Sequence, residues 1–340
     1  MSADVKPSTS QIRGVNLGSW LLVEKWMLDP SISILAKFDG DSELEILRSN
    51  CLNKVREALH QHHNNYITEE DFAWLAKHGI NSVRVPVGYW LFYDLMGEMF
   101  EGDPFYVYRD IYLDGHRYLT RTFNWGIKHG ITILIDLHGL PGGQNDENHN
   151  GTSDKGLFWS NFEHFDRVFT RLVDRLYREY SSRPNYLGIS LCNEPKCSIE
   201  ELKRAIQCWD ESFSHYRGWV ILPQIWETND RPSEYTSRYN YEGKFMIDSH
   251  LYYCFNQPEL TMNDILGKVL PEREGEIKLC QRLIIGEWSL AVSQKCSDQN
   301  IRSYAASQIK CYEQASAWYF WSYKCRYSGW SFRASHIYLH

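Results

Sequence analysis

Two carboxylates that directly follow short apolar runs are the residues of this sequence best placed to do chemistry. Glu194 lies in "GISLCNEPKC" (188–197), and Glu287 lies in "RLIIGEWS" (282–289). Cleavage of a glycosidic bond needs two such groups: one carboxylic acid protonates the leaving oxygen, and one carboxylate faces the anomeric carbon. Asn193 precedes Glu194 and can hold a sugar 2-hydroxyl, a contact that strengthens in the transition state. The pair therefore predicts acid/base chemistry on a sugar.

Other polar and aromatic side chains end the neighbouring apolar runs. An arginine beside Glu287, such as Arg84, would lower the pKa of that carboxyl and keep the nucleophile ionised. Glu194 would need a raised pKa to serve as an acid near neutral pH. The further candidates at run ends, several of them suited to bond and orient the carboxylates, are Asn16, Glu24, His138, His250, Tyr252 and Trp321.

Eight short runs rich in Val, Ile and Leu must position these residues. They span 12–20, 80–88, 131–139, 186–195, 218–224, 244–253, 282–289 and 316–324. Several are continuously apolar, as in a parallel sheet that is buried on both faces. Segments with helix-start and helix-stop signals separate them, at 68–79, 113–130, 157–180, 198–216 and 300–316. This alternation predicts an α/β fold, a TIM (β/α)8 barrel, whose strands bring their C-terminal ends to one mouth.

The whole chain fits one such barrel. We expect residues 1–10 to form a disordered N-terminal tail and residues 11–340 to form a single catalytic domain. The segment from residue 11 to about 66 is long for one strand–helix unit, so an irregular excursion over the barrel mouth is expected at 29–43.

Composition and charge exclude several classes of protein. The net charge of -7 argues against nucleic-acid binding, which needs a basic face. No apolar run approaches the ~18 residues of a membrane span. The N-terminus lacks the apolar core of a secretory signal, so we expect either an intracellular protein or a chain that begins after a removed signal. The nine cysteines show no zinc-site spacing and are expected to be mostly reduced thiols.

Two alternatives use the same residues differently. A metal site would recruit Asp136, His138, His250 and Glu287, but neither an HxH nor an HExxH spacing supports it, and we expect no metal. A catalytically inactive, carbohydrate-binding barrel would retain the aromatic residues and lose a carboxylate, whereas both carboxylates are present.

Seven motifs in order resemble glycoside hydrolase family 5 (cellulase family A, clan A), and within it the exo-β-1,3-glucanases of fungi. They are "RGVNLGSWLLVEKWM", "VRVPVGYW", "DLHGLPGGQN", "NEP", "DSHLYY", "GEWS" and "WYFWSYK", across about residues 11–333. The resemblance implies a retaining β-glycosidase without cofactor or metal that acts on a β-glucan or β-glucoside, here expected as a monomer. Glu194 aligns with the family's acid/base and Glu287 with its nucleophile.

The same resemblance assigns the surrounding subsite. It places Arg84, His138, Asn193, His250, Tyr252 and Trp321 around the cleaved sugar, Glu24 at the terminal glucose hydroxyls, and Phe255 at one aromatic of a clamp on the leaving sugar. The other aromatic of that clamp is replaced by the polar residues 146–148. Exo-1,3-β-glucosidase activity is therefore expected, with a β-glucosidase acting on glucosylated lipids or sterols, or an endo-β-glucanase of the same family, as alternatives.

Overall fold

Eight parallel strands close into a barrel in this computed structural model, which describes residues 11–154, 156–225, 244–255, 260–293 and 296–339. Each strand pairs with the next along the chain, and β8 returns to β1. The strands are β1 Ile12–Asn16, β2 Ser82–Gly88, β3 Thr132–Gly139, β4 Tyr186–Ser190, β5 Trp219–Leu222, β6 Met246–Leu251, β7 Leu283–Trp288 and β8 Ala317–Phe320. The predicted TIM barrel is thus confirmed, while the predicted tail at 1–10 lies outside the described residues.

All eight predicted strands are present, but six of them end earlier than their apolar runs suggested. β4 ends at Ser190, so Asn193 and Glu194 lie in the loop that follows it. Trp20 and Trp321 likewise follow β1 and β8. The ladder stops where the chain turns over the barrel mouth, so the candidate residues come from loop starts as well as from strand ends.

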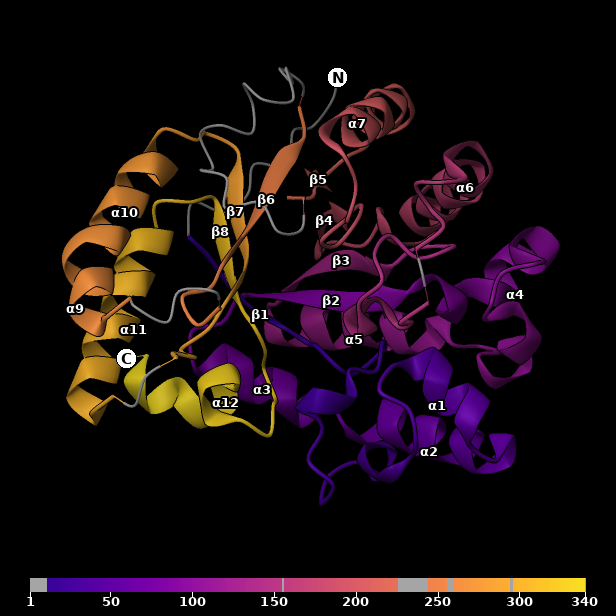
Figure 1. The fold of residues 1–340 in the computed structure, drawn as a ribbon, viewed down its shortest axis with the longest axis horizontal. Coiled ribbons are helices and arrows are strands. Elements are labelled where there is room, and N and C mark those ends of the chain that lie inside the picture. The colour runs from indigo at the N-terminus through magenta and orange to yellow at the C-terminus, as the bar shows by residue number, and fades with distance from the viewer. Residues whose placement is uncertain (1–10, 155, 226–243, 256–259, 294–295, 340) are drawn as a thin grey trace.

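Helices surround the barrel, and the five that we predicted are present (Figure 1). They are α3 Glu69–Lys77, α5 His116–His129, α6 Phe162–Tyr180, α7 Ile199–Phe213 and α11 Asp298–Tyr312. Residues 29–42 are irregular, as expected, apart from the short 3-10 helix Ile34–Lys37. Two unpredicted helices, α1 Glu43–Ser49 and α2 Leu52–Asn65, lie between this segment and α3. The remaining α-helices of the described residues are α4 Tyr93–Met96, α9 Met262–Asp264, α10 Leu270–Lys278 and α12 Phe332–Ser335. Among the described helices, none has the length and apolar character needed to cross a membrane.

The barrel interior consists of an apolar layer beneath a polar one. Tyr319 lies at the centre of the apolar layer, its ring over Gly14, where even a Cβ atom would clash. Its hydroxyl contacts Ser82 Oγ at 2.9 Å. The other members of that layer are Ile12, Leu134, Ile221, Met246, Ile284 and Ala317. In β1, β2, β3 and β6 the inward positions two residues after Gly14, Ser82, Leu134 and Met246 carry Asn16, Arg84, Asp136 and Asp248, all buried.

An irregularity in β7 directs Glu287 into the barrel. Ser249 of β6 pairs with Ile285, but His250 pairs with Glu287, so Gly286 is an extra residue in β7. Strict alternation from the inward Ile284 would send the Glu287 side chain outward. The bulge restores the inward direction, and Gly286 is required there because a Cβ would lie 2.1 Å from Asp248 Oδ1.

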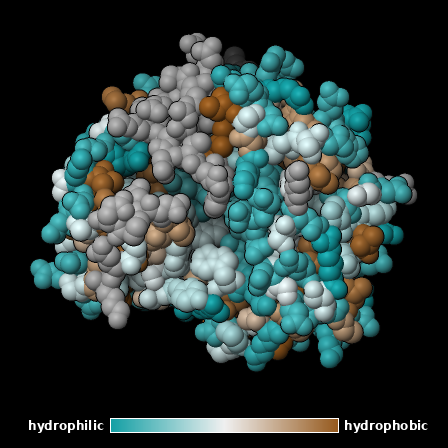
Figure 2. Space-filling model, viewed as in Figure 1, coloured by the Kyte–Doolittle hydropathy of each residue, from teal (hydrophilic) through white to brown (hydrophobic). Residues whose placement is uncertain are grey.

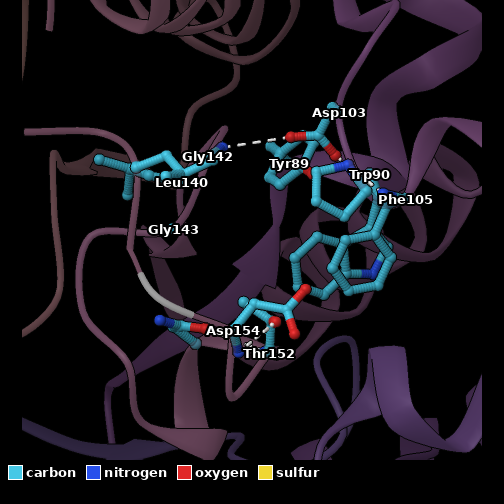
Figure 3. Close-up of a pocket in the computed structure, with 12 residues that line it drawn as sticks. Tyr89, Trp90, Asp103, Phe105, Leu140, Gly142, Gly143, Thr152 and Asp154 are labelled. Atoms are coloured by element: carbon cyan, nitrogen blue, oxygen red, sulfur yellow. Dashed lines mark hydrogen bonds between the residues drawn. The ribbon is translucent and has the colours of Figure 1, made fainter. Parts of the chain in front are cut away.

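The loop between β3 and α6 (140–161) packs against the loop after β2. Asp103 accepts hydrogen bonds from the backbone amides of Phe105 and Gly142, at 2.9 and 3.1 Å. A cavity of about 50 Å³ remains between these loops, beside the stacked rings of Trp90 and Phe105 (Figure 3). Residues on the face shown in Figure 2 are mostly hydrophilic, and the hydrophobic ones form small separate groups. The cavity lies outside the carboxylate cluster, but the contacts around it anchor the loop that covers Glu194.

Candidate active site

Arg84 is the centre of the polar layer and directly contacts Glu287. It is fully buried and donates from Nη1 to Glu287 Oε1 at 3.0 Å and to Asn16 Oδ1 at 2.9 Å. Its Nη2 donates to Asn193 Oδ1 at 2.9 Å and lies 3.1 Å from Asp136 Oδ1. The second oxygen of Glu287 accepts from the Tyr252 hydroxyl at 2.7 Å. Glu287 is therefore held in one orientation by donors on both of its oxygens.

Glu194 lies across the mouth, between two imidazoles. His250 Nδ1 lies 2.6 Å from Oε1, and His149 Nε2 lies 3.5 Å from Oε2. Its backbone has φ 43°, a left-handed conformation that is costly for a glutamate. A carboxylate oxygen of Glu194, one of Glu287 and a nitrogen of His250 all lie within 4.8 Å of one another. That separation matches two carboxyl groups acting on one anomeric carbon with retention, for which about 5–5.5 Å is typical.

His138 and Trp321 form the wall beside the two carboxylates. Their rings stack at 5.3 Å between centroids and 11° between planes. His138 Nδ1 contacts Asp136 Oδ2 at 2.7 Å, while its Nε2 meets the Asn193 amide nitrogen at 3.3 Å. Although burial opposes it, the charge of Asp136 raises the pKa of His138. The Trp321 side chain is therefore fixed by its histidine neighbour, as a stacking platform requires.

Glu24 is buried and has one unsatisfied oxygen. Oε2 accepts from Trp26 Nε1 at 3.0 Å, whereas Oε1 has no hydrogen-bond partner among the described residues. Burial raises the pKa of Glu24 to about 7, although His138 opposes the shift. A buried acceptor without a protein donor suits the hydroxyl of a bound ligand.

Phe255 belongs to an aromatic rim outside the carboxylates. It is 55% exposed and lies 5.6 Å from the Tyr252 ring and 5.7 Å from the Trp330 ring. Trp330 in turn contacts Trp26 at 5.6 Å, and Trp26 stacks on Tyr327 at 6.4 Å. The rim thus continues from the Glu287 partner Tyr252 to the neighbourhood of Glu24.

The expected order of the two carboxyl pKa values is wrong. Burial raises the pKa of Glu287, and the negative charge of Glu194 raises it further. The positive charges of His250 and Arg84 lower this pKa, but their effect is smaller than the combined rise. Burial would also raise the pKa of Glu194, but the charge of His250, at 2.6 Å, lowers it. His250 lies nearer to Glu194 than to Glu287, whose Oε2 is 3.5 Å away, and Arg84 divides its charge among several partners.

The predicted site residues lie around this mouth, but the sequence interpretation missed several of their supports. Asp248 lies 3.7 Å from Arg84 and accepts from the Gly286 amide at 2.8 Å. Its inward position could have been found by counting two residues back from His250. Asn145 and His149, in the loop between β3 and α6, carried no signal beyond a polar composition. Cys192, which directly precedes Asn193, is packed in the hydrophobic core and forms no disulfide bond with another described residue.

Comparison with known proteins identifies the family. The profile "Cellulase (glycosyl hydrolase family 5)" matches residues 49–332. This chain belongs to glycosyl hydrolase family 5. It is an O-glycosyl hydrolase, and the family acts with retention of configuration.

Curated relatives of this family 5 member include fungal glucanases. Glucan 1,3-beta-glucosidase 3 of Schizosaccharomyces pombe is 30% identical over 94% of this chain and 71% of that protein. The probable glucan endo-1,6-beta-glucosidase B of Aspergillus terreus is 26% identical, and the match covers 96% of this chain and 85% of that protein. The crystal structure of rutinosidase from Aspergillus niger is 17% identical, with a TM-score of 0.77 over 98% of both chains, which supports the fold.

Proposed function

We propose that this family 5 enzyme hydrolyses β-glucosidic bonds as a glucan exo-1,3-β-glucosidase, with Glu287 as nucleophile and Glu194 as acid/base. The observation that carries the proposal is the placement of the two carboxylates across one mouth, with oxygens within 4.8 Å. Glu287 attacks the anomeric carbon while Glu194 protonates the leaving oxygen. Glu194 then removes a proton from water, which attacks the same carbon and releases the sugar and Glu287.

The neighbouring contacts support these roles. Arg84 donates a hydrogen bond to one oxygen of Glu287, and Tyr252 donates to the other. These hydrogen bonds stabilise Glu287 as the carboxylate that leaves the sugar in the second step. The proton that Glu194 delivers can reach it across the 2.6 Å contact with His250 Nδ1. Because the pKa of His250 is raised, against the effect of burial, by the carboxylates around it, that imidazole is protonated near neutral pH.

Glu24 and Trp321 support recognition of a terminal glucose. Trp321 offers a flat ring against one face of a pyranose, and the unsatisfied Glu24 Oε1 offers an acceptor for its hydroxyls. The name of the Schizosaccharomyces pombe relative supports a β-1,3-linked glucan as the substrate.

A second substrate class is favoured by the aromatic rim. Phe255 and Tyr327 are about half exposed, and Trp26 is 38% exposed. Such a surface suits an apolar leaving group, so a β-glucosidase acting on glucosylated lipids or sterols is the second candidate.

One panel of substrates separates these candidates. Laminarin, cello-oligosaccharides, mannan, glucosylceramide and steryl glucoside should be assayed side by side, and the first product followed by NMR. Release of β-glucose from laminarin supports the proposal, and preference for the lipid substrates supports the second candidate. Initial release of α-glucose would contradict the double displacement.

A further inference from the structure

His149 forms the side of the Glu194 carboxylate opposite His250. Its side chain is 16% exposed, and Nε2 lies 3.5 Å from Glu194 Oε2. The same nitrogen lies 3.0 Å from Asn145 Nδ2. The charge state and the tautomer of His149 therefore decide whether it presents a donor, a positive charge or a lone pair to the carboxyl group.

The orientation of the Asn145 amide determines that tautomer. Asn145 Oδ1 accepts from the backbone N–H of Glu147 at 3.0 Å, and a backbone N–H can only donate. Asn145 Nδ2 therefore faces the other way, donating to the backbone oxygen of Glu194 at 2.9 Å and to His149 Nε2. Because Nε2 receives a hydrogen bond, it carries no proton, and the imidazole is neutral with its proton on Nδ1. Burial acts in the same direction and lowers the pKa of His149 to about 4.

An unprotonated nitrogen facing Glu194 Oε2 favours the acid form of that carboxyl group. The electron density on this nitrogen repels the ionised oxygen at 3.5 Å, whereas the protonated oxygen can share its lone pair with the Asn145 donor. Distances of this length at catalytic groups commonly shorten once substrate binds.

We propose that His149 is a positioning residue that opposes His250 and raises the proton affinity of Glu194. The inference rests on the proposed function, since it concerns the acid/base of that reaction. The first step benefits because Glu194 retains the proton that it transfers to the leaving oxygen. The second step benefits because a more basic Glu194 removes a proton from the attacking water more readily.

The loop that carries His149 is anchored on several sides. Leu44 N donates to Gly151 O at 2.9 Å, and Trp159 Nε1 donates to Gln144 O at 2.9 Å. Asn150 Nδ2 donates to Asn145 Oδ1 at 2.6 Å. The position of the His149 imidazole is therefore fixed by an anchored loop and not by its side-chain conformation alone.

The test is the pH dependence of kcat/KM for His149→Phe, with His164→Phe as the control for loss of an exposed histidine. Two substrates are compared: laminaribiose, whose leaving group must be protonated, and 2,4-dinitrophenyl β-glucoside, whose leaving group needs no proton. Because the pKa of Glu194 lies below that of Glu287 in the free enzyme, the acid limb for laminaribiose follows Glu194. We expect this limb to move down by about 1 pH and kcat/KM at the optimum to fall by about tenfold, since an interaction that favours the acid form is lost. We expect kcat/KM for the dinitrophenyl substrate to stay within about twofold, because a leaving group that needs no proton bypasses general acid catalysis.

The direction of the shift decides the question. An acid limb for laminaribiose that stays in place or moves up would overturn the inference, because a cationic His149 would have lowered the pKa of Glu194. An equal loss on both substrates would also overturn it, since it indicates a merely structural role. The other titratable groups that interact with Glu194 or His149 are left unchanged by the substitution; these are Glu24, Asp136, His138, His250, Tyr252 and Glu287.

A second variant covers the case in which His149→Phe does not fold. In His149→Gln, Asn145 Nδ2 can donate to the amide oxygen of the new glutamine, so that the glutamine N–H group faces Glu194. An N–H donor favours the ionised carboxylate, so the same downward shift is expected. A parent enzyme without activity on any β-glucoside would refute the proposed function itself. An active parent with an unshifted limb in the variant refutes only the role of His149.

Discussion

Removal of the Tyr252 hydroxyl tests Glu287 as the nucleophile. That hydroxyl donates to Glu287 Oε2 at 2.7 Å and stabilises the ionised carboxylate. A hydrogen bond to a charged group contributes about 1.5–3 kcal/mol, and about 1.4 kcal/mol corresponds to one pKa unit. Tyr252→Phe should therefore raise the pKa of Glu287 and move the acid limb of kcat/KM up by about 1 to 2 pH. At pH values below the acid limbs of both the parent and the variant, kcat/KM of the variant should be about 10- to 100-fold lower than that of the parent.

The assay is kcat/KM for 2,4-dinitrophenyl β-glucoside from pH 4 to 9, since this leaving group makes the rate independent of acid catalysis by Glu194. Tyr253→Phe is the matched control: its ring lies 6.3 Å from Tyr304, in the core outside the barrel. The control should reproduce the parent profile. An acid limb that moves by less than about 0.3 pH, or that moves down, would show that ionisation of Glu287 does not govern this limb.

Three further variants test the other roles. Glu194→Gln should lower kcat/KM on laminarin by about 10²- to 10⁴-fold and largely spare the dinitrophenyl substrate; equal losses on both would contradict the acid role. Trp321→Ala should lower kcat/KM by about 10- to 100-fold, since burial of an apolar side chain is worth about 1.5–3 kcal/mol, and full activity would show that no sugar stacks there. Arg84→Met should lower the free energy of unfolding in urea by about 3–5 kcal/mol because it leaves Asp136 and Glu287 without their buried cation, and an unchanged midpoint would contradict that pairing.

The architecture and the two carboxylates could be predicted from the sequence because each rests on a local pattern. Continuous apolar runs indicate buried parallel strands, and alternation along β6 places Asp248, His250 and Tyr252 on one side. Helix α1 was missed although its capping box, Ser42 with Glu45, is visible in the sequence. Its apolar positions are too few for a periodic signal.

The features that could not be predicted depend on register and on long-range contacts. The Glu287 side chain points into the barrel because of the bulge at Gly286, where the register between β6 and β7 shifts by one residue. The pKa order of the carboxyls depends on His250 lying 2.6 Å from one and 3.5 Å from the other. The role of His149 depends on which way Asn145 turns its amide, and this is decided by a backbone N–H two residues further on.

These contacts make the site titrate as a group. Arg84 bridges Glu287 to Asp136 and Asn193, Asn193 meets His138, and His250 lies between Glu194 and Glu287. When titrating groups interact this strongly, each apparent pKa in a rate profile belongs to the set and not to one residue. A limb of the rate profile can therefore be assigned to one carboxyl group only by comparing the parent enzyme with a variant that lacks a single contact to that group. Tyr252 and His149 suit this purpose because each faces a different carboxyl group. Loss of the Tyr252 hydroxyl should move the acid limb up on the dinitrophenyl substrate, whereas loss of His149 should move the acid limb down on laminaribiose.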